Sequence, residues 1–247
     1  MSSGKIRLLL HGAQSAARNM ATDEALLQTA RGANDPDAIV LRIYQWEEPA
    51  YSIGYFQKIE TLKKFAASRG ENFPIVRRMT GGGAVRHGQD LTFSLCARMP
   101  NPLIPSDVRE SYLKINDALR AGFLTLEPAL DFADCRSIPS GRAGVRALCF
   151  EAPSCFDLLL NGRKIVGASQ RRVGGAVLYQ SSILLNRDPR SMIEAMLNGF
   201  QKKWAVEFET SQLDAQESAL VARVESERYE SPDWCSRPFS REAIFFS

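Results

Sequence analysis

The chain has 247 residues, of which 45% are hydrophobic and 24% are charged, and its formal net charge is +3. These values are typical of a soluble globular protein and exclude the disordered, collagen-like and low-complexity classes. So small an excess of positive charge does not by itself indicate nucleic acid binding. A chain of this length can bury a hydrophobic core without metals or disulfides, and we expect one domain over residues 1–247.

Neither a membrane segment nor a metal site is expected. No uninterrupted apolar run exceeds four residues, and the N-terminus lacks the apolar stretch of a signal peptide. The five cysteines form no CxxC pair and have only two histidines to join them, which argues against a zinc site or a disulfide framework. We therefore expect free thiols and a cytoplasmic protein. A monomer is the plain expectation for its oligomeric state.

In the first half of the chain, the composition of residues 19–30 predicts a helix with Asn19 as its N-cap. Alternating apolar residues predict a strand at 39–44, and a segment rich in Lys and Ala predicts a helix at 58–69. A short strand at 75–78 and a half-buried strand at 91–97 are expected on either side of a glycine-rich break.

In the second half, a helix is predicted after Ser106, its expected N-cap, from an apolar stripe made by Val108, Tyr112, Ile115, Leu119 and Gly122. Residues 134–147 are expected to form a mobile loop. Asn161-Gly162 predicts a type I′ hairpin, followed by a strand at 176–185 and helices at 191–204 and 214–229. This order predicts a mixed sheet with helices on one face.

The first candidate site is the segment Arg77-Arg78-Met79-Thr80-Gly81-Gly82-Gly83-Ala84-Val85. Glycines let backbone N–H groups approach an anion closely, and the two arginines offer forked donors to a carboxylate or phosphate. The same residues also suit a flexible turn between two strands with solvated arginines. The spacing matches neither the P-loop nor the dinucleotide-binding motif.

Lys164, Cys149 and His87 are further candidates. The Lys164 amine can polarise a carbonyl or hold a phosphate, and Gly167 and Ala168 beyond it leave room for a ligand, although most strand lysines are simply solvated. Cys149 ends a polar, arginine-containing loop, where positive charge favours a reactive thiolate, although an inert thiol is the commoner state of a cysteine. His87 suits a base or hydrogen-bond donor, or else a structural residue at a strand edge.

Together, these segments resemble the lipoate–protein ligase and octanoyltransferase family. RRMTGGGAVRHG at 77–88 resembles that family's RRx[ST]GGGAVxH signature, and NGRKIVGASQRR at 161–172 resembles its GxKIxGxAQ-R signature. RIYQWEEPAYSIGYFQ at 42–57, NMATDEALL at 19–27 and SERYESPDW near the C-terminus are also similar to family segments. The matches keep their order and spacing from about residue 6 to residue 190, and the GRGRxGR-like loop of biotin–protein ligases is absent.

CFEAPSCFDL at 149–158 resembles the CFDAPSWYEL segment of the M-type octanoyltransferases, in which the cysteine is the acyl-accepting nucleophile. The resemblance implies that Cys149 attacks an octanoyl or lipoyl thioester on an acyl carrier protein. A lysine of a lipoyl domain, or of the glycine-cleavage H protein, then takes the acyl group as an amide without ATP. Lys164 matches the family's acyl-contacting lysine and is expected to stabilise the oxyanion and the thiolate.

The resemblance also implies a biotin/lipoate–protein ligase-like catalytic domain of the α+β class, with a mixed, mainly antiparallel sheet and helices packed on it. The residues expected to bind substrate, besides the catalytic Cys149 and Lys164, are Arg77, Arg78, Gly81, Gly82, Gly83, Ala84, Val85, His87, Gly167, Ala168 and Ser181. The expected partners are an acyl carrier protein donor and a lipoyl-domain or H-protein acceptor, with no nucleic acid and no membrane.

Three departures from the family keep alternatives open. His87-Gly88 stands for the family's His-Asp, and Gln180-Ser181 stands for the His-Gly of its Leu-x-His-Gly strand. The glycine loop has the spelling usual in ATP-using ligases rather than the GGRG common in M-type transferases. The first alternative is a lipoate–protein ligase that uses ATP and Mg, acts through lipoyl-AMP and takes an accessory domain from a separate chain. The second is a non-catalytic module that binds a lipoyl domain.

Overall fold

A six-stranded sheet forms the centre of the protein in a computed structural model that describes residues 4–136 and 153–237. The strand order is β10 (Val166–Val173), β11 (Ala176–Ile183), β6 (Leu91–Arg98), β2 (Ile39–Trp46), β1 (Gly4–Gln14) and β12 (Val206–Ser211). The strands from β10 to β2 pair with one another in antiparallel, whereas β1 is parallel to both β2 and β12. The predicted mixed, mainly antiparallel sheet is therefore confirmed.

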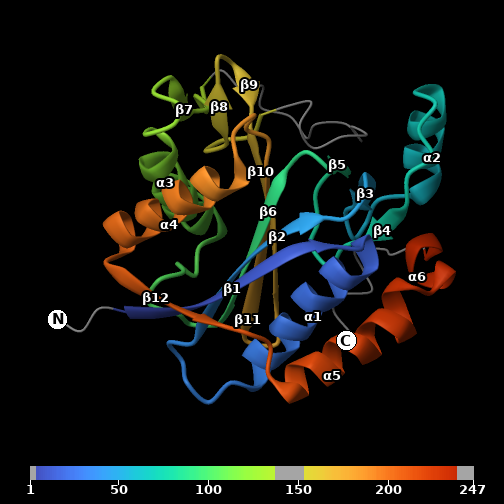
Figure 1. Cartoon of the computed structure of the whole chain (residues 1–247), viewed down its shortest axis with the longest axis horizontal. Helices are drawn as coiled ribbons and strands as arrows, with labels where there is room; N and C mark the ends of the chain where they lie inside the picture. The colour runs from blue at the N-terminus through green and yellow to red at the C-terminus, as the bar shows by residue number, and fades with distance from the viewer. Residues whose placement is uncertain (1–3, 137–152, 238–247) are drawn as a thin grey trace.

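Helices cover both faces of this sheet, so the prediction of helices on one face is wrong. Figure 1 shows α3 (Val108–Phe123) and α4 (Pro189–Trp204) on one side, and α1 (Ala16–Gly32) and α5 (Ala215–Val224) on the other. The larger hydrophobic core includes Phe93, Leu119 and Phe200, while Leu26 and Leu178 belong to a separate cluster on the opposite face. The physical reason is that strands such as β11 are buried along their whole length, so both faces need cover.

Two glycines let α3 and α4 cross at close range. A Cβ atom at Gly122 would lie 1.9 Å from the Ala195 carbonyl oxygen, and one at Gly199 would lie 2.2 Å from the Ala118 carbonyl oxygen. Neither clash can be relieved by moving a side chain, because both involve backbone atoms. The contact between the two helices therefore depends on the absence of side chains at these positions.

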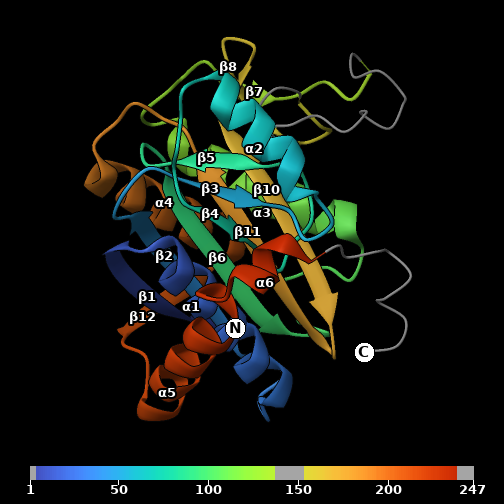
Figure 2. The same ribbon diagram turned by 90° about the vertical axis from the view of Figure 1, so that its right-hand side faces the viewer.

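Two small sheets flank the main one. The first has the order β4 (Ile75–Arg77), β3 (Ala50–Ile53) and β5 (Val85–His87), and α2 (Ile59–Ser68) packs beside it. Figure 2 shows these strands crossing in front of the strands of the main sheet. The second contains β7 (Leu130–Phe132), β8 (Leu158–Leu160) and β9 (Arg163–Lys164). Asn161 and Gly162 between β8 and β9 have φ angles of 51° and 78°, which confirms the type I′ turn.

Helix boundaries differ from the expected ones at the N-terminal ends. Ser15 caps α1, and the predicted cap Asn19 lies one turn inside the helix with its side chain buried. Asp107, rather than Ser106, caps α3 by accepting a hydrogen bond from the Glu110 N–H. The expected final helix is divided into α5, a π-helical turn at Glu225–Tyr229 and α6 (Pro232–Ser236).

Strands β1 and β12 were not predicted. They pair with each other in parallel, and this pairing joins segments about 200 positions apart that no local pattern connects. The expected loop at 134–147 lies mostly outside the described residues. None of the described helices has the length and apolar character needed to cross a membrane.

Candidate functional site

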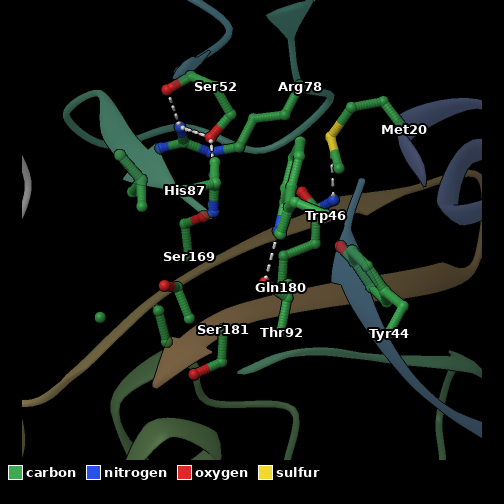
Figure 3. Close-up of a pocket in the computed structure, with 14 residues that line it drawn as sticks. Met20, Tyr44, Trp46, Ser52, Arg78, His87, Thr92, Ser169, Gln180 and Ser181 are labelled. Carbon is green, nitrogen blue, oxygen red and sulfur yellow. Dashed lines mark hydrogen bonds between the residues drawn. The ribbon is translucent and has the colours of Figure 1, made fainter. Parts of the chain in front are cut away.

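A small cavity of about 30 Å³, partly open to solvent, lies between the main sheet and the β4-β3-β5 sheet. Figure 3 shows Ser52 and Arg78 at one end of this cavity, with Ser181 of the main sheet across from them. The residues that line it come from α1, from both sheets and from the segments between them: Met20, Tyr44, Trp46, Ser52, Arg78, Val85, His87, Thr92, Gly167, Ala168, Ser169, Gln180, Ser181 and Ser182. The wall is thus partly apolar and partly hydrogen-bonding, as ligand sites generally are.

His87 links two polar side chains in the cavity wall. Its Nδ1 is 2.7 Å from Asp90 Oδ2, and its Nε2 is 2.8 Å from Ser52 Oγ. The ring stacks on that of Trp46, with 3.7 Å between centroids and 14° between planes. Because both ring nitrogens and one ring face are occupied, the orientation of His87 is fixed.

Asp90 is the buried anion behind His87. Its burial would by itself raise the pKa of the carboxyl group, but the charge of His87 and hydrogen bonds from His87, Ser182 and the Gly88 N–H lower the pKa to about 2. Asp90 therefore stays ionised, and the His87 Nδ1–H donates to it. Gly88 suits this arrangement, since its φ of 121° is unfavourable for other residues and a Cβ would lie 3.1 Å from Pro49 Cα.

The glycine loop wraps around the side chain of Arg78. Its Nη2 donates to the Gly81 carbonyl oxygen and, at 2.8 Å, to that of Gly83, while its Nε is 3.1 Å from Thr80 Oγ1. Its Nη1 is 3.2 Å from both Ser52 O and Ser52 Oγ. The guanidinium therefore shapes the loop from inside and also lines the cavity, 5% exposed.

A chain of hydrogen bonds crosses from the cavity wall into the protein. Ser169 Oγ donates to Thr80 Oγ1 at 2.8 Å, Thr80 Oγ1 donates to Gln180 Oε1 at 2.7 Å, and Gln180 Nε2 donates to Asp23 Oδ2 at 2.6 Å. Because every group on this path has a defined partner, the side chains hold one arrangement.

Asp23 on α1 is the end of that chain and a hub for three strands of the main sheet. Its carboxylate pairs with Arg42 Nη1 at 2.8 Å and accepts hydrogen bonds from Tyr44 and Ser94 at 2.8 and 2.7 Å. Asp23 and Arg42 are 1% and 0% exposed. With Gln180 as a fourth partner, the buried charge has the full set of contacts that such a charge requires.

Ser181 carries an unsatisfied hydroxyl group at the cavity. Its Oγ is buried and has no hydrogen-bond partner among the described residues, although the side chain lines the cavity. A buried polar atom without a partner costs free energy, and such atoms are rare in native structures. The hydroxyl of Ser181 is therefore available to a ligand group in the cavity.

Lys164 lies in an almost completely buried ion pair. Its Nζ is 2.7 Å from Asp157 Oδ2, and the two side chains are 4% and 10% exposed. Burial raises the pKa of Asp157, and the charge of Lys164 opposes that rise. Asp157 Oδ2 also accepts a hydrogen bond from the Ser154 N–H at 2.6 Å. The pair thus fixes the ammonium group at β9, three residues before the cavity residue Gly167.

The structure brings only some of the expected site residues to the cavity. Those that line it are Arg78, Val85, His87, Gly167, Ala168 and Ser181, and those that do not are Arg77, Gly81, Gly82, Gly83, Ala84 and Lys164. The expected nucleophile Cys149 lies outside the described residues. The glycines nevertheless contribute indirectly, because their carbonyl groups hold Arg78.

Arg77 was expected to contact a ligand, but its side chain is bonded to backbone carbonyl oxygens instead. Its side chain is 1% exposed and donates to carbonyl oxygens of residues 54, 55 and 57 on one side. On the other side it donates to the carbonyl oxygens of Trp234 and Cys235. Arg77 therefore joins the C-terminal α6 to the segment after β3.

Several cavity residues were not predicted, among them Trp46, Ser52 and Gln180. The run Gln180-Ser181-Ser182 interrupts an otherwise apolar strand, and this was an available signal, because polar residues in a fully buried strand need a specific partner. Ser52 and Trp46 carried no comparable signal. Their place at the cavity follows from the pairing of β3 with β5 and of β2 with β6.

Comparisons with known proteins agree with this arrangement. The model of the lipoyl protein ligase A/B catalytic domain matches residues 15–219. A Moorella thermoacetica protein named octanoyltransferase LipM is 41% identical over 184 residues, which cover 72% of this chain and 64% of that protein. The protein of the same name from Carboxydothermus hydrogenoformans is 32% identical over 270 residues, covering 94% of this chain and 98% of its own length.

A solved structure is similar in fold. It is that of Ta0514 from T. acidophilum, described as a putative lipoate protein ligase with bound lipoic acid. The TM-score is 0.75 at 22% sequence identity, and the alignment covers 96% of this chain and all of the other. The similarity confirms the fold expected from the sequence, a ligase-like α+β catalytic domain.

Proposed function

Because the chain belongs to the lipoyl protein ligase A/B catalytic domain family, we propose that it is a protein acyltransferase that moves an octanoyl or lipoyl group through a thioester at Cys149. The observation that carries the proposal is the similarity to proteins named octanoyltransferase at up to 41% identity, together with the resemblance of the segments around Cys149 and Lys164 to that type of enzyme. The partners in this proposal are an acyl carrier protein as donor and a lipoyl domain or H protein as acceptor.

The proposed reaction has two steps, transfer of the acyl group to Cys149 and then to the acceptor lysine. The Cys149 thiolate adds to the carbonyl carbon of the donor thioester. The thiolate of the carrier protein leaves and takes up a proton, so that one thioester replaces another. The amine of the acceptor lysine then adds to the enzyme thioester. An amide forms, the carbon–sulfur bond breaks, and the proton lost by the amine returns to Cys149. No step consumes ATP.

Lys164 has the electrostatic role in this proposal. Its ammonium group is held at 2.7 Å from Asp157 in surroundings with little water, where a positive charge acts more strongly than at the surface. Such a charge stabilises both a thiolate and the oxyanion that forms when the carbonyl is attacked. Asp157 orients the ammonium group through this ion pair.

The cavity is proposed to bind the acyl group. Met20, Trp46 and Val85 offer apolar surface to a hydrocarbon chain, and the Ser181 hydroxyl offers one hydrogen bond to a polar atom of the ligand. Arg78, whose guanidinium lies inside the glycine loop and lines the cavity, adds positive charge for a phosphate-bearing donor.

Intact-mass measurement tests the proposal. The protein is incubated with octanoyl–acyl carrier protein without ATP, and the expected result is a covalent octanoyl adduct on the wild type. Cys149→Ala should form no adduct, whereas the matched control Cys96→Ala, which removes a buried thiol on β6, should still form it. An adduct that persists in Cys149→Ala would refute the assignment of the nucleophile.

One observation favours a second candidate, the ATP-dependent lipoate–protein ligase. The loop Gly81-Gly82-Gly83-Ala84 has the ligase spelling, and ATP with Mg would then be required. This alternative is supported if the protein forms no octanoyl adduct but releases pyrophosphate when ATP and lipoate are both present. If neither reaction occurs and an apo-lipoyl domain still binds, the non-catalytic module is the remaining function.

A further inference from the structure

Cys135 and Cys155 lie on two segments that the β7–β8 pairing brings side by side. In this pair Leu130 is opposite Leu160 and Phe132 is opposite Leu158, and the next residue, Ala133, donates its N–H to the Asp157 carbonyl oxygen at 2.8 Å. The two segments run antiparallel, so each residue further along the first is matched by one residue earlier in the second. Cys135 lies two positions after Ala133 and Cys155 two positions before Asp157, each in a turn next to this contact.

The side chains of the two cysteines also meet. The thiols of Cys155 and Cys135 are close enough to interact, and this interaction is the main reason why the pKa of Cys155 is raised, while the charge of Arg109 opposes the rise. Both residues are partly exposed. By contrast, Cys96 is 1% exposed and Cys235 is bonded to the Ile75 carbonyl oxygen.

We propose that Cys135 and Cys155 form a dithiol site that a low-molecular-weight disulfide oxidises to an intramolecular disulfide. One protein thiolate attacks a sulfur atom of the small disulfide, which gives a mixed disulfide and releases one small thiolate. The second protein thiolate attacks the protein sulfur of that intermediate and releases the other small thiolate. The two protons lost by the cysteines are taken up by the two leaving thiolates, and two electrons pass from the protein to the reagent.

The geometry favours ring closure over a lasting mixed disulfide. The Ala133–Asp157 hydrogen bond holds the two segments together two positions away from each cysteine, so the thiols are kept near each other. The second thiol is already in contact with the first, so its effective concentration is high. Arg109, whose Cζ lies 5.8 Å from the ring of Phe156, adds positive charge beside the attacking sulfur.

The proposed Cys135–Cys155 disulfide would close a covalent ring in the chain. It closes a ring from residue 135 to residue 155, and that ring contains Cys149. The proposal itself concerns the two thiols and does not depend on the acyl transfer proposed above. Octanoyl loading of the reduced protein tests the transferase function separately, so the failure of one proposal is distinguishable from the failure of the other.

The experiment is oxidation of the native, full-length chain with oxidised glutathione, followed by alkylation and peptide mapping. The expected product has lost two hydrogen atoms, carries no glutathione at Cys135 or Cys155, and yields one cross-linked peptide that contains both residues. Reduction with dithiothreitol should restore the original mass.

Single variants sharpen the test. In Cys135→Ser the intermediate cannot be resolved, so glutathione should remain attached to Cys155, and Cys155→Ser should give the converse result at Cys135. Cys235→Ser is the matched control and should form the bridge as the wild type does. A stable glutathione adduct at Cys155 of the wild type, a bridge from either residue to Cys149, or the absence of any reaction at both thiols would overturn the proposal.

Discussion

Replacing Lys164 by methionine tests the buried ion pair at the heart of the proposed mechanism. Methionine keeps much of the length and apolar character of the lysine stem but removes the charge. The variant leaves a carboxylate at Asp157 that is about one-tenth exposed in the wild type and still accepts a hydrogen bond from the Ser154 N–H. Breaking a buried pair by removing one partner costs about 3–5 kcal/mol, and the retained hydrogen bond places the expected loss near 3 kcal/mol at neutral pH.

The loss should depend on pH in a defined direction. Burial raises the pKa of Asp157 even in the wild type, and without the charge of Lys164 that pKa rises further. A carboxyl group whose pKa is higher in the folded than in the unfolded state stabilises the fold when it is protonated and destabilises it as the pH rises through the folded pKa. The stability difference between Lys164→Met and the wild type should therefore shrink as the pH is lowered from neutrality towards the ordinary pKa of an aspartate.

The assay is urea unfolding of both proteins at a series of pH values, followed by circular dichroism. The double variant Lys164→Met/Asp157→Asn is the control, because it lacks the charge that would be left unpaired, and it should be more stable at neutral pH than Lys164→Met alone. A cost below about 1 kcal/mol, or the same cost at every pH, would refute the reasoning, since such results are typical of an exposed pair.

Three further predictions concern the core and the cavity. Gly122→Ala should lower the free energy of unfolding by several kcal/mol in urea unfolding, because the new Cβ meets the Ala195 carbonyl oxygen, whereas Gly32→Ala, with open space around it, should not. Asp90→Asn should remove about 2 kcal/mol of stability, which the wild type holds above about pH 4 and loses by about pH 2. The melting temperature of the variant should therefore depend less on pH in this range. A pH dependence equal to that of the wild type would contradict this prediction. Ser181→Ala should leave the melting temperature nearly unchanged, because its hydroxyl has no partner among the described residues, yet weaken acyl-ligand binding in calorimetry; equal affinity would exclude that hydroxyl from the ligand contact.

Local signals in the sequence predicted the elements whose conformation depends on one or two residues. Asn161-Gly162 gave the correct turn, because both positions require a positive φ that these residue types adopt readily. Helix starts were less predictable. Ser15 and Asn19 are both good caps, and Asn19 is used instead inside the helix, where its side chain bonds to the Gln14 and Gln45 carbonyl oxygens and to Arg42.

The candidate site was predictable only in part, for a related reason. The glycine loop and His87 belong to a continuous motif, but the partners that fix them are distant in sequence. Gln180 reaches Asp23 across 157 positions, and Trp46 donates to Thr92 across 46. Such contacts depend on sheet register, which a single sequence does not specify.

The hub at Asp23 has a thermodynamic consequence for any molecule that enters the cavity. Through Tyr44 and Gln180, which line the cavity, it immobilises part of the cavity wall while the chain folds. The entropy of ordering these side chains is therefore lost during folding, before a ligand arrives. Ligand binding then needs little free energy to order this part of the cavity wall. Discrimination between acyl chains should consequently come from the fit to a rigid shape, and homologous ligands that differ by one methylene should show differences in affinity rather than adjustments of the wall.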